Sequence, residues 1–153
     1  MTFAPGMVTL GPGEGHRLEA FGNTHFNKAV EADTGGAWTL IEQHVTGANP
    51  PLHQHEREDE AFYVLQGRVR VWVGDVATDA EAGGFVLAPR GVPHTFARQP
   101  GDDLKMLLMI SPAGLERFFE EISELSETEQ QDPSTLSELA ARYEVQVLGP
   151  PPE

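Results

Sequence analysis

The chain has 153 residues, of which 24 are acidic and 10 are basic, so its formal net charge is −14 at pH 7. This length suits one globular domain, and the negative charge disfavours nucleic acid or anionic membrane surfaces as partners. No apolar run reaches the roughly 18 residues of a membrane span. The absence of cysteine excludes disulfides, thiolate nucleophiles and Cys-ligated metal sites. Any metal would therefore be bound by nitrogen and oxygen atoms.

Residues 1–15 are rich in Gly and Pro, with neither a basic start nor an apolar central segment, which is not typical of a secretory signal. A cytoplasmic location is therefore expected. We expect residues 1–153 to form a single domain, because the sequence contains no internal repeat and no long linker.

Between residues 23 and 111, short apolar segments alternate with Gly, Pro, Asn and Asp, which is typical of an all-β protein. In residues 68–73, valines alternate with arginines and a tryptophan, so the valine face should be buried. The pattern predicts strands over residues 38–46, 61–65, 69–73, 85–88, 94–98 and 104–110.

A helical pattern follows these strands. Ser111 is the predicted N-cap and Pro112 the first helical residue. Apolar residues then recur at helical spacing, at Leu115, Phe118, Phe119, Ile122 and Leu125. A second helix is predicted after Asp132, and a closing strand over residues 145–148. Both helices would pack an apolar stripe on the β region, and we interpret Phe118 and Phe119 as core residues.

Four residues of the β region are candidates for one metal site. His53 and His55 would point to the same side of an extended segment, because side chains two apart share a face. The charged residues 56–59 indicate a turn, after which Glu60 would begin the neighbouring antiparallel strand, beside the two histidines. His94 would complete the set from a more distant strand. Taken singly, a strand histidine is more often structural than a ligand, and a charged run is usually a solvated turn.

Taken together, these positions resemble the two motifs of the cupin superfamily. The first, Gly-x5-His-x-His-x4-Glu-x6-Gly, is complete as Gly47, His53, His55, Glu60 and Gly67. Its chance of arising from this composition is roughly 2–3 × 10⁻⁴. The second, Gly-x5-Pro-x-Gly-x2-His-x3-Asn, is present as Gly83, Pro89, Gly91 and His94, with Arg98 in place of Asn. Because that Asn is not a ligand in cupins, the departure concerns strand packing and leaves the metal site intact.

The resemblance implies a jelly-roll antiparallel β-barrel over about residues 23–111, with one or two carboxy-terminal helices over about residues 112–145. It also implies one divalent transition metal at the mouth of the barrel, bound by His53, His55, Glu60 and His94. Iron, manganese, nickel, cobalt and zinc all suit this donor set, which leaves one or two coordination positions open. A homodimer is expected from the resemblance alone.

Residues 57–65 and 111–121 resemble small bacterial cupins that are described as similar to quercetin 2,3-dioxygenase. This implies a dioxygenase-like oxidoreductase acting on a small aromatic or enolic compound, with Glu60 as a base toward its hydroxyl. Because cupins share a fold but differ in reaction, two alternatives stay open. One is a non-redox isomerase, cyclase or lyase that uses the ion as a Lewis acid, and the other is a non-catalytic small-molecule-binding protein.

Strand alternation also predicts a pocket beside the metal. If Glu60 faces inward, so do Phe62 and Val64, and an inward His94 brings Phe96 with it. An apolar cavity around one charged centre is typical of a small-molecule site. Plain packing of the barrel interior would explain the same aromatic residues, and that alternative stays open.

Overall fold

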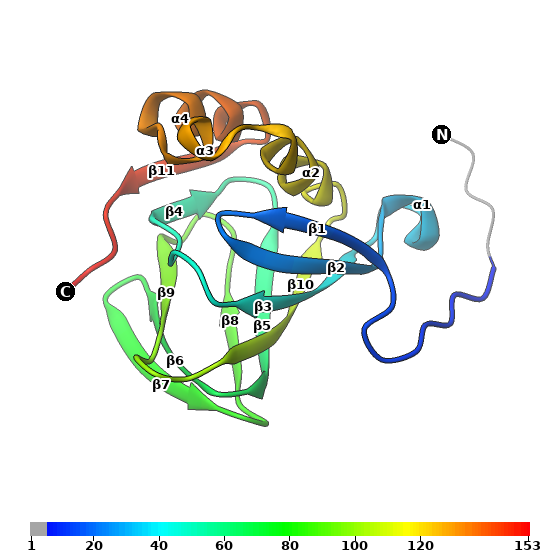
Figure 1. The fold of residues 1–153 in the computed structure, drawn as a ribbon. Helices are drawn as coiled ribbons and strands as arrows, with labels where there is room; N and C mark the ends of the chain where they lie inside the picture. The colour runs from blue at the N-terminus through cyan, green and yellow to red at the C-terminus, as the bar shows by residue number, and fades with distance from the viewer. Residues whose placement is uncertain (1–5) are drawn as a thin grey trace.

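In the computed structural model, which describes residues 6–153, the strands form two antiparallel sheets with a layer of helices over one end (Figure 1). The six-stranded sheet has the order β1-β2-β3-β10-β5-β8, and the five-stranded sheet has the order β11-β4-β9-β6-β7. The strands are β1 (His16–Ala20), β2 (Asn23–Ala29), β3 (Thr39–Val45), β4 (Leu52–His55), β5 (Asp59–Gln66), β6 (Arg68–Val73), β7 (Val76–Glu81), β8 (Phe85–Ala88), β9 (His94–Arg98), β10 (Leu104–Ser111) and β11 (Val145–Gly149).

The six strands predicted between residues 38 and 110 are all present, and each end lies within two residues of its predicted position. Val69 and Val71 of β6 are fully buried, as their alternation with polar residues predicts. In contrast, β1, β2 and β7 were not predicted, because their sequences, HRLEA, NTHFNKA and VATDAE, contain few large apolar residues. Since β1 and β11 both join the sheets, the β structure extends beyond residues 23–111 on both sides.

The helices of the described residues are α1 (Glu31–Thr34), α2 (Glu116–Glu124), α3 (Glu127–Gln131) and α4 (Pro133–Arg142). Three helices therefore follow the strands, rather than the one or two that were predicted. Asp132 caps α4 as predicted, since its side chain accepts a hydrogen bond from the Thr135 amide. Among the described residues, no helix combines the length and the apolar character that crossing a membrane requires.

The predicted start of the first carboxy-terminal helix is wrong. Ser111 still pairs with Asp59 as the last residue of β10, and its hydroxyl donates a hydrogen bond to the Ala37 carbonyl. Because the backbone of Ser111 pairs in the sheet and its hydroxyl bonds Ala37, Ser111 does not cap a helix. The N-cap of α2 is Leu115 instead.

The helical layer is attached to the sheets by a second apolar cluster. Ile122 of α2 and Leu139 of α4 pack with Leu18 and Ala20 of β1, and all four side chains are buried. Phe118 and Phe119 contact both this cluster and the main core between the sheets. The helices thus close the end of the sheets where β4 and β11 lie (Figure 1).

Candidate metal centre and cavity

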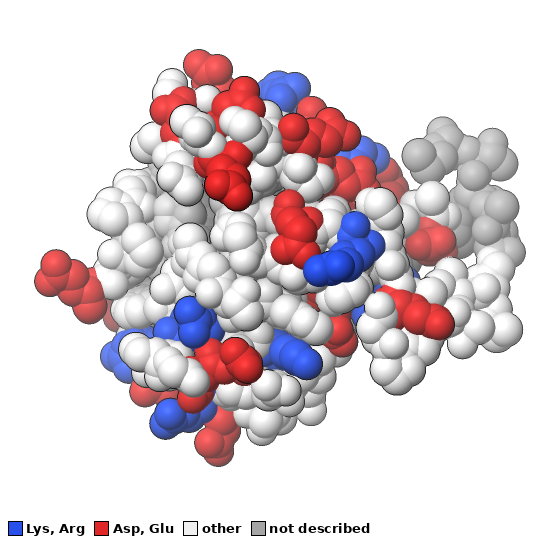
Figure 2. Space-filling view, viewed as in Figure 1, with Lys and Arg blue, Asp and Glu red and all other residues white. Residues whose placement is uncertain are grey.

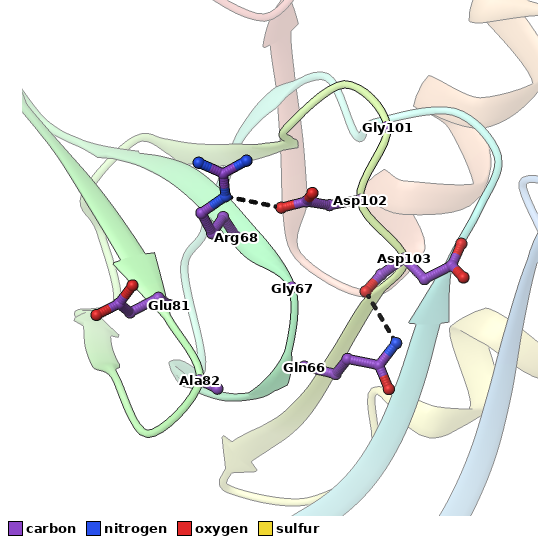
Figure 3. Close-up of a pocket in the computed structure, with 8 residues that line it drawn as sticks. All are labelled: Gln66, Gly67, Arg68, Glu81, Ala82, Gly101, Asp102 and Asp103. Atoms are coloured by element: carbon purple, nitrogen blue, oxygen red, sulfur yellow. Dashed lines mark hydrogen bonds and ion pairs between the residues drawn. The ribbon is translucent and has the colours of Figure 1, made fainter.

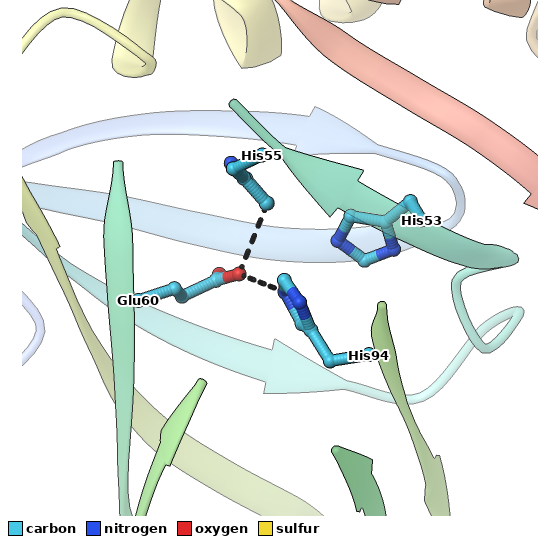
Figure 4. A group of neighbouring side chains, drawn as sticks. All are labelled: His53, His55, Glu60 and His94. Atoms are coloured by element: carbon cyan, nitrogen blue, oxygen red, sulfur yellow. Dashed lines mark hydrogen bonds and ion pairs between the residues drawn. The ribbon is translucent and has the colours of Figure 1, made fainter. Parts of the chain in front are cut away.

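Four side chains converge between the two sheets (Figure 4). They are His53 and His55 of β4, Glu60 of β5 and His94 of β9, and one donor atom of each lies within 4.8 Å of the others. The structure therefore brings together all four residues that the sequence proposed as ligands. They come from both sheets, because β4 and β9 belong to the five-stranded sheet and β5 to the six-stranded sheet.

The predicted arrangement of these strands is wrong in one respect. Glu60 was expected on a strand beside the two histidines, but β4 pairs with β9, and His53 lies directly opposite His94. Residues 56–58 carry the chain from one sheet to the other instead of forming a hairpin turn. Glu60 therefore faces the three histidines from across the space between the sheets, and a bound ion would connect them.

The backbone fixes how two of the imidazoles are oriented. The Nδ1 atom of His53 lies 2.8 Å from the Pro51 carbonyl oxygen, and that of His94 lies 3.0 Å from the Val92 carbonyl oxygen. A carbonyl only accepts, so each ring donates its Nδ1 proton there. This leaves Nε2 as the atom that a metal would bind, and in His94 that atom lies 2.9 Å from Glu60 Oε2. Both rings thus direct a metal-binding nitrogen toward Glu60 and His55.

The imidazole of His55 lies between two carboxylates. Its Nδ1 lies 3.4 Å from Glu58 Oε2, and its Nε2 lies 3.2 Å from Glu60 Oε2. Neither ring nitrogen has a well-directed hydrogen bond among the described residues, although the residue is only 3% exposed. Unpaired buried nitrogen costs free energy, so these residues fit a divalent ion that uses the Nε2 atom. Three imidazole nitrogens and one carboxylate oxygen suit a first-row transition metal.

The charges of the cluster are strongly coupled. Burial opposes ionisation of Glu60, but the nearby positive charges of His55 and His94, together with the hydrogen bond from His94 Nε2, hold its pKa well below the usual value. Burial alone would also lower the pKa of His55, yet the two neighbouring carboxylates raise it to about 9. Burial, together with the charge of His94, lowers the pKa of His53 to about 4. A divalent cation would replace the proton on His55, so metal binding should release protons.

Glu58 is a residue of the site that the sequence did not reveal. The run 56–59 was interpreted as a solvated turn, but the Glu58 side chain is 2% exposed and lies against His55 Nδ1. A carboxylate behind a ligand histidine orients the ring and increases its basicity. The only feature of the sequence that indicates this role is the position of Glu58 three residues after His55. The neighbouring charged residues of the run 56–59 hide it, because the sequence does not show which of them is buried.

We expect Glu58→Gln to weaken metal affinity by about tenfold or more, because the amide cannot supply the negative charge behind His55. Competition with a chromophoric chelator would measure the change. Glu56→Gln is the matched control, since Glu56 is exposed and its carboxylate bonds, within residues 6–153, only Gln54. Equal affinities of the two variants would contradict a positioning role for Glu58.

A cavity of about 310 Å³ lies against the cluster. His53, His55 and Glu60 line one part of it, and most of the remaining wall is apolar. Phe62 and Phe96 line it, whereas Val64, which was predicted with them, is 1% exposed and packs in the core away from the cavity wall. The sequence missed the contribution of the helical layer, which includes Phe118 and Phe119.

A second depression lies at the far end of the sheets and is open to solvent (Figure 3). The turns around Gly67, Ala82 and Gly101 line it. Its Arg68 guanidinium donates a 2.9 Å hydrogen bond to Asp102, so this charge is already paired. The depression contains no cluster of ligating or nucleophilic groups among the described residues, and the cavity beside the four ligands is the better candidate.

His25 of β2 lies outside the ligand cluster and is completely buried against Gln43 and Phe119. Burial lowers its pKa from 6.5 to about 4. The unfolded chain therefore binds a proton near pH 6.5 and the folded chain only near pH 4, so stability present above pH 6.5 is lost as the pH falls to 4. The difference corresponds to about 3 kcal/mol.

His25→Leu should remove this part of the acid sensitivity. We expect the difference in unfolding free energy between pH 7.5 and pH 4.5 to shrink by about 2–3 kcal/mol in metal-free protein, measured by urea unfolding. The control is His16→Leu, at an exposed histidine of β1, which should keep the wild-type difference. An unchanged pH dependence in His25→Leu would show that His25 is not titrating between these values.

Residues 41–111 match the family model described as the cupin domain. Quercetin 2,3-dioxygenase of Bacillus subtilis (strain 168) is 28% identical over 111 residues, which cover 72% of this chain and 33% of that protein. An uncharacterized protein of Streptomyces coelicolor is 36% identical over 55 residues, which cover 36% of this chain and 51% of that protein. The chain thus spans about a third to a half of the length of these curated relatives.

Two solved structures show a similar fold. KdgF from Halomonas sp. matches with a TM-score of 0.55 and 23% identity, over 63% of this chain and 85% of that chain. Pac13, described as a nucleoside dehydratase, matches with a TM-score of 0.54 and 17% identity, over 68% of this chain and 81% of that chain. At these identities the likeness concerns the fold and not the reaction.

Proposed function

We propose, from the match of residues 41–111 to the cupin-domain family model, that the protein is a metal-dependent dioxygenase for a small, uncharged aromatic or enolic compound. The cavity is the observation that carries the proposal, because it joins an apolar wall to His53, His55 and Glu60 of the four-residue cluster. A site of this kind binds an apolar ligand and orients it by a few polar groups. The similarity to quercetin 2,3-dioxygenase supports the choice of substrate class.

The protein groups have separate tasks in this proposal. His53, His55, Glu60 and His94 would hold the ion, which would supply Lewis acidity and the redox chemistry with O₂. Glu60 is the only carboxylate that lines the cavity in the described part of the chain. Its oxygen accepts the proton of a substrate hydroxyl, which leaves the more reactive anion of the substrate in the site. The aromatic side chains of the cavity wall exclude water and contact the substrate ring through their edges and faces.

The charge distribution favours an uncharged substrate. No Lys or Arg lines the cavity among residues 6–153, so nothing there would bind a phosphate or a second carboxylate. Acidic side chains also gather over the helices that cover the cavity (Figure 2). Together with the net charge of −14, they repel anions that approach this end of the molecule.

An oxygen-electrode assay tests the reaction. Metal-free protein is reconstituted separately with iron, manganese, nickel, cobalt or zinc and screened with flavonols and dicarbonyl compounds. We expect O₂ consumption with at least one redox-active metal and none with zinc. Binding of these compounds without O₂ consumption under any metal would refute the dioxygenase and favour a non-redox reaction or simple binding.

We also propose that the chain forms a homodimer through the outer face of β5, β8 and β10. Five large apolar side chains are 40–62% exposed there: Tyr63, Leu65, Phe85, Leu87 and Met109. At about 200 Å² for each full side chain, they expose roughly 500 Å². This suits the centre of a standard interface, which buries about 800 Å² on each partner. A second copy supplies the same apolar patch, so the two patches would cover each other.

Phe85→Glu should shift the dimer to monomer, because it places a buried, unpaired charge in that interface. Light scattering after size exclusion would measure the mass. Val76→Glu is the control, since Val76 is 67% exposed on β7 of the other sheet. A wild-type mass equal to that of one chain at micromolar concentration would contradict the dimer.

A further inference from the structure

A pair of buried polar side chains lies on β2 and β3, apart from the ligand cluster. His25 and Gln43 are opposite each other in the strand register, and their Nε2 atoms are 3.1 Å apart. His25 is fully buried and Gln43 is 7% exposed. Neither the Oε1 atom of Gln43 nor the Nδ1 atom of His25 has a hydrogen-bond partner within residues 6–153.

The chemistry of this pair always leaves one half of the Gln43 amide unpaired. A neutral imidazole has one donor and one acceptor nitrogen. If His25 Nε2 accepts from the Gln43 NH₂ group, the amide oxygen is free. If the amide is turned over and its oxygen accepts from His25 Nε2–H, the NH₂ group is free. Gln43 is therefore able to offer either an acceptor or a donor to a third group.

Gln43 lines the same cavity as His53, His55 and Glu60. In the register of β10, Gln43 lies opposite Met106, whereas Glu60 lies opposite Ile110. These positions are four residues apart, which is about 14 Å along the strand. The cavity thus has an ion-binding group toward one end, an amide toward the other, and aromatic side chains between them.

We propose that Gln43, positioned by His25, recognises a polar group on the part of the ligand that lies away from the ion. The ligand is then an elongated, uncharged molecule with a metal-binding oxygen at one end and a hydroxyl, carbonyl or amide group at the other. This inference rests on the proposed function in one respect, because it assumes that the ligand also binds at the four-residue cluster. Gln43 then determines specificity, and the substrate carries a second polar group.

Two probes that differ by one distant hydroxyl test the proposal: 3-hydroxyflavone and 3,4′-dihydroxyflavone. Binding to the zinc-loaded protein is followed by the change in flavonol absorbance, so that no turnover is needed. We expect wild type to bind the dihydroxy compound at least about tenfold more tightly, since a buried polar group discriminates strongly by hydrogen bonding. Gln43→Leu should remove this preference and retain affinity for 3-hydroxyflavone. An unchanged preference in Gln43→Leu would overturn the proposal.

Gln130→Leu is the matched control. Gln130 also lines the cavity, but its amide oxygen accepts from the Phe21 amide and its NH₂ group donates to the Leu125 carbonyl. Because each half of this amide already has a partner within the protein, Gln130 lacks the wholly unpaired group that Gln43 offers to a ligand. The variant should therefore keep the wild-type preference between the two flavonols, even if its thermal midpoint falls.

A second measurement separates this inference from the proposed function. The double variant His25→Leu/Gln43→Leu replaces two partly paired buried groups by apolar ones, so a role in ligand recognition predicts an unchanged or raised thermal midpoint. A clear fall would show that the pair is structural and would overturn the inference. If wild type binds neither flavonol, the proposed substrate class fails, and the thermal midpoint still decides the role of Gln43.

Discussion

Bound metal is expected to fall from about one ion per chain to background when His53 and His55 are both replaced by Ala. The two substitutions remove two of the three nitrogen donors and leave His94 and Glu60, which cannot hold a transition metal against dialysis. Elemental analysis after reconstitution and extensive dialysis would measure the stoichiometry. Full stoichiometry in this variant would refute the assignment of the site.

The control for that experiment is a double variant at two other histidines, His16→Ala/His44→Ala. His44 also contacts a carboxylate, with its Nε2 atom 2.9 Å from Glu42 Oε2, but this pair lies on the outer side of β3. We expect this control to retain the full amount of metal. The comparison is needed because a chain with a net charge of −14 attracts cations nonspecifically.

The second large effect is on stability. A bound ion would connect β4 and β9 of one sheet to β5 of the other, and unfolding separates these ligands. At a free metal concentration of 1,000 times Kd, binding to the folded state adds about 4 kcal/mol to the unfolding free energy. For a chain of this length, the melting temperature should rise by about 8–16 °C.

Thermal unfolding of chelator-treated and reconstituted protein would measure this shift. The His53→Ala/His55→Ala variant should show no comparable shift at the same metal concentration. An equal rise in the variant would mean that the ion stabilises the protein from another position. Magnesium at the same concentration serves as the second control, because it prefers oxygen ligands and should have little effect.

The sequence predicted the strands well where apolar and polar residues alternate, and it identified the four residues that the structure brings together. It did not predict the strand neighbours correctly, because the interval from His55 to Glu60 is compatible with a hairpin as well as with a passage between sheets. Only contacts distant in sequence, such as His53 with His94, distinguish these two arrangements. Motif spacing therefore predicted which residues meet and not how their strands pair.

Two further features were ambiguous for a physical reason. The apolar stripe with Phe118 and Phe119 is the same whether a helix packs on a core or covers a cavity, since both require apolar side chains.

The position of Gln43 could have been recognised from the sequence, because it lies between Ile41 and Val45 on the inward face of β3. A polar residue at a buried position in an alternating strand indicates a partner or a ligand.

The pairing of β4 with β9 consists of a single residue pair, His53 with His94. The five-stranded sheet therefore has little backbone pairing at the position where the candidate ion would bind. The other neighbour of β4 is β11, which lies near the end of the chain. Backbone amides of β4 should exchange their hydrogens with solvent by local opening, without unfolding of the whole protein. Coordination of His53 and His94 by one ion would slow that exchange, and so couple metal occupancy to the protection of the strand that lies at the helix-covered end of the sheets.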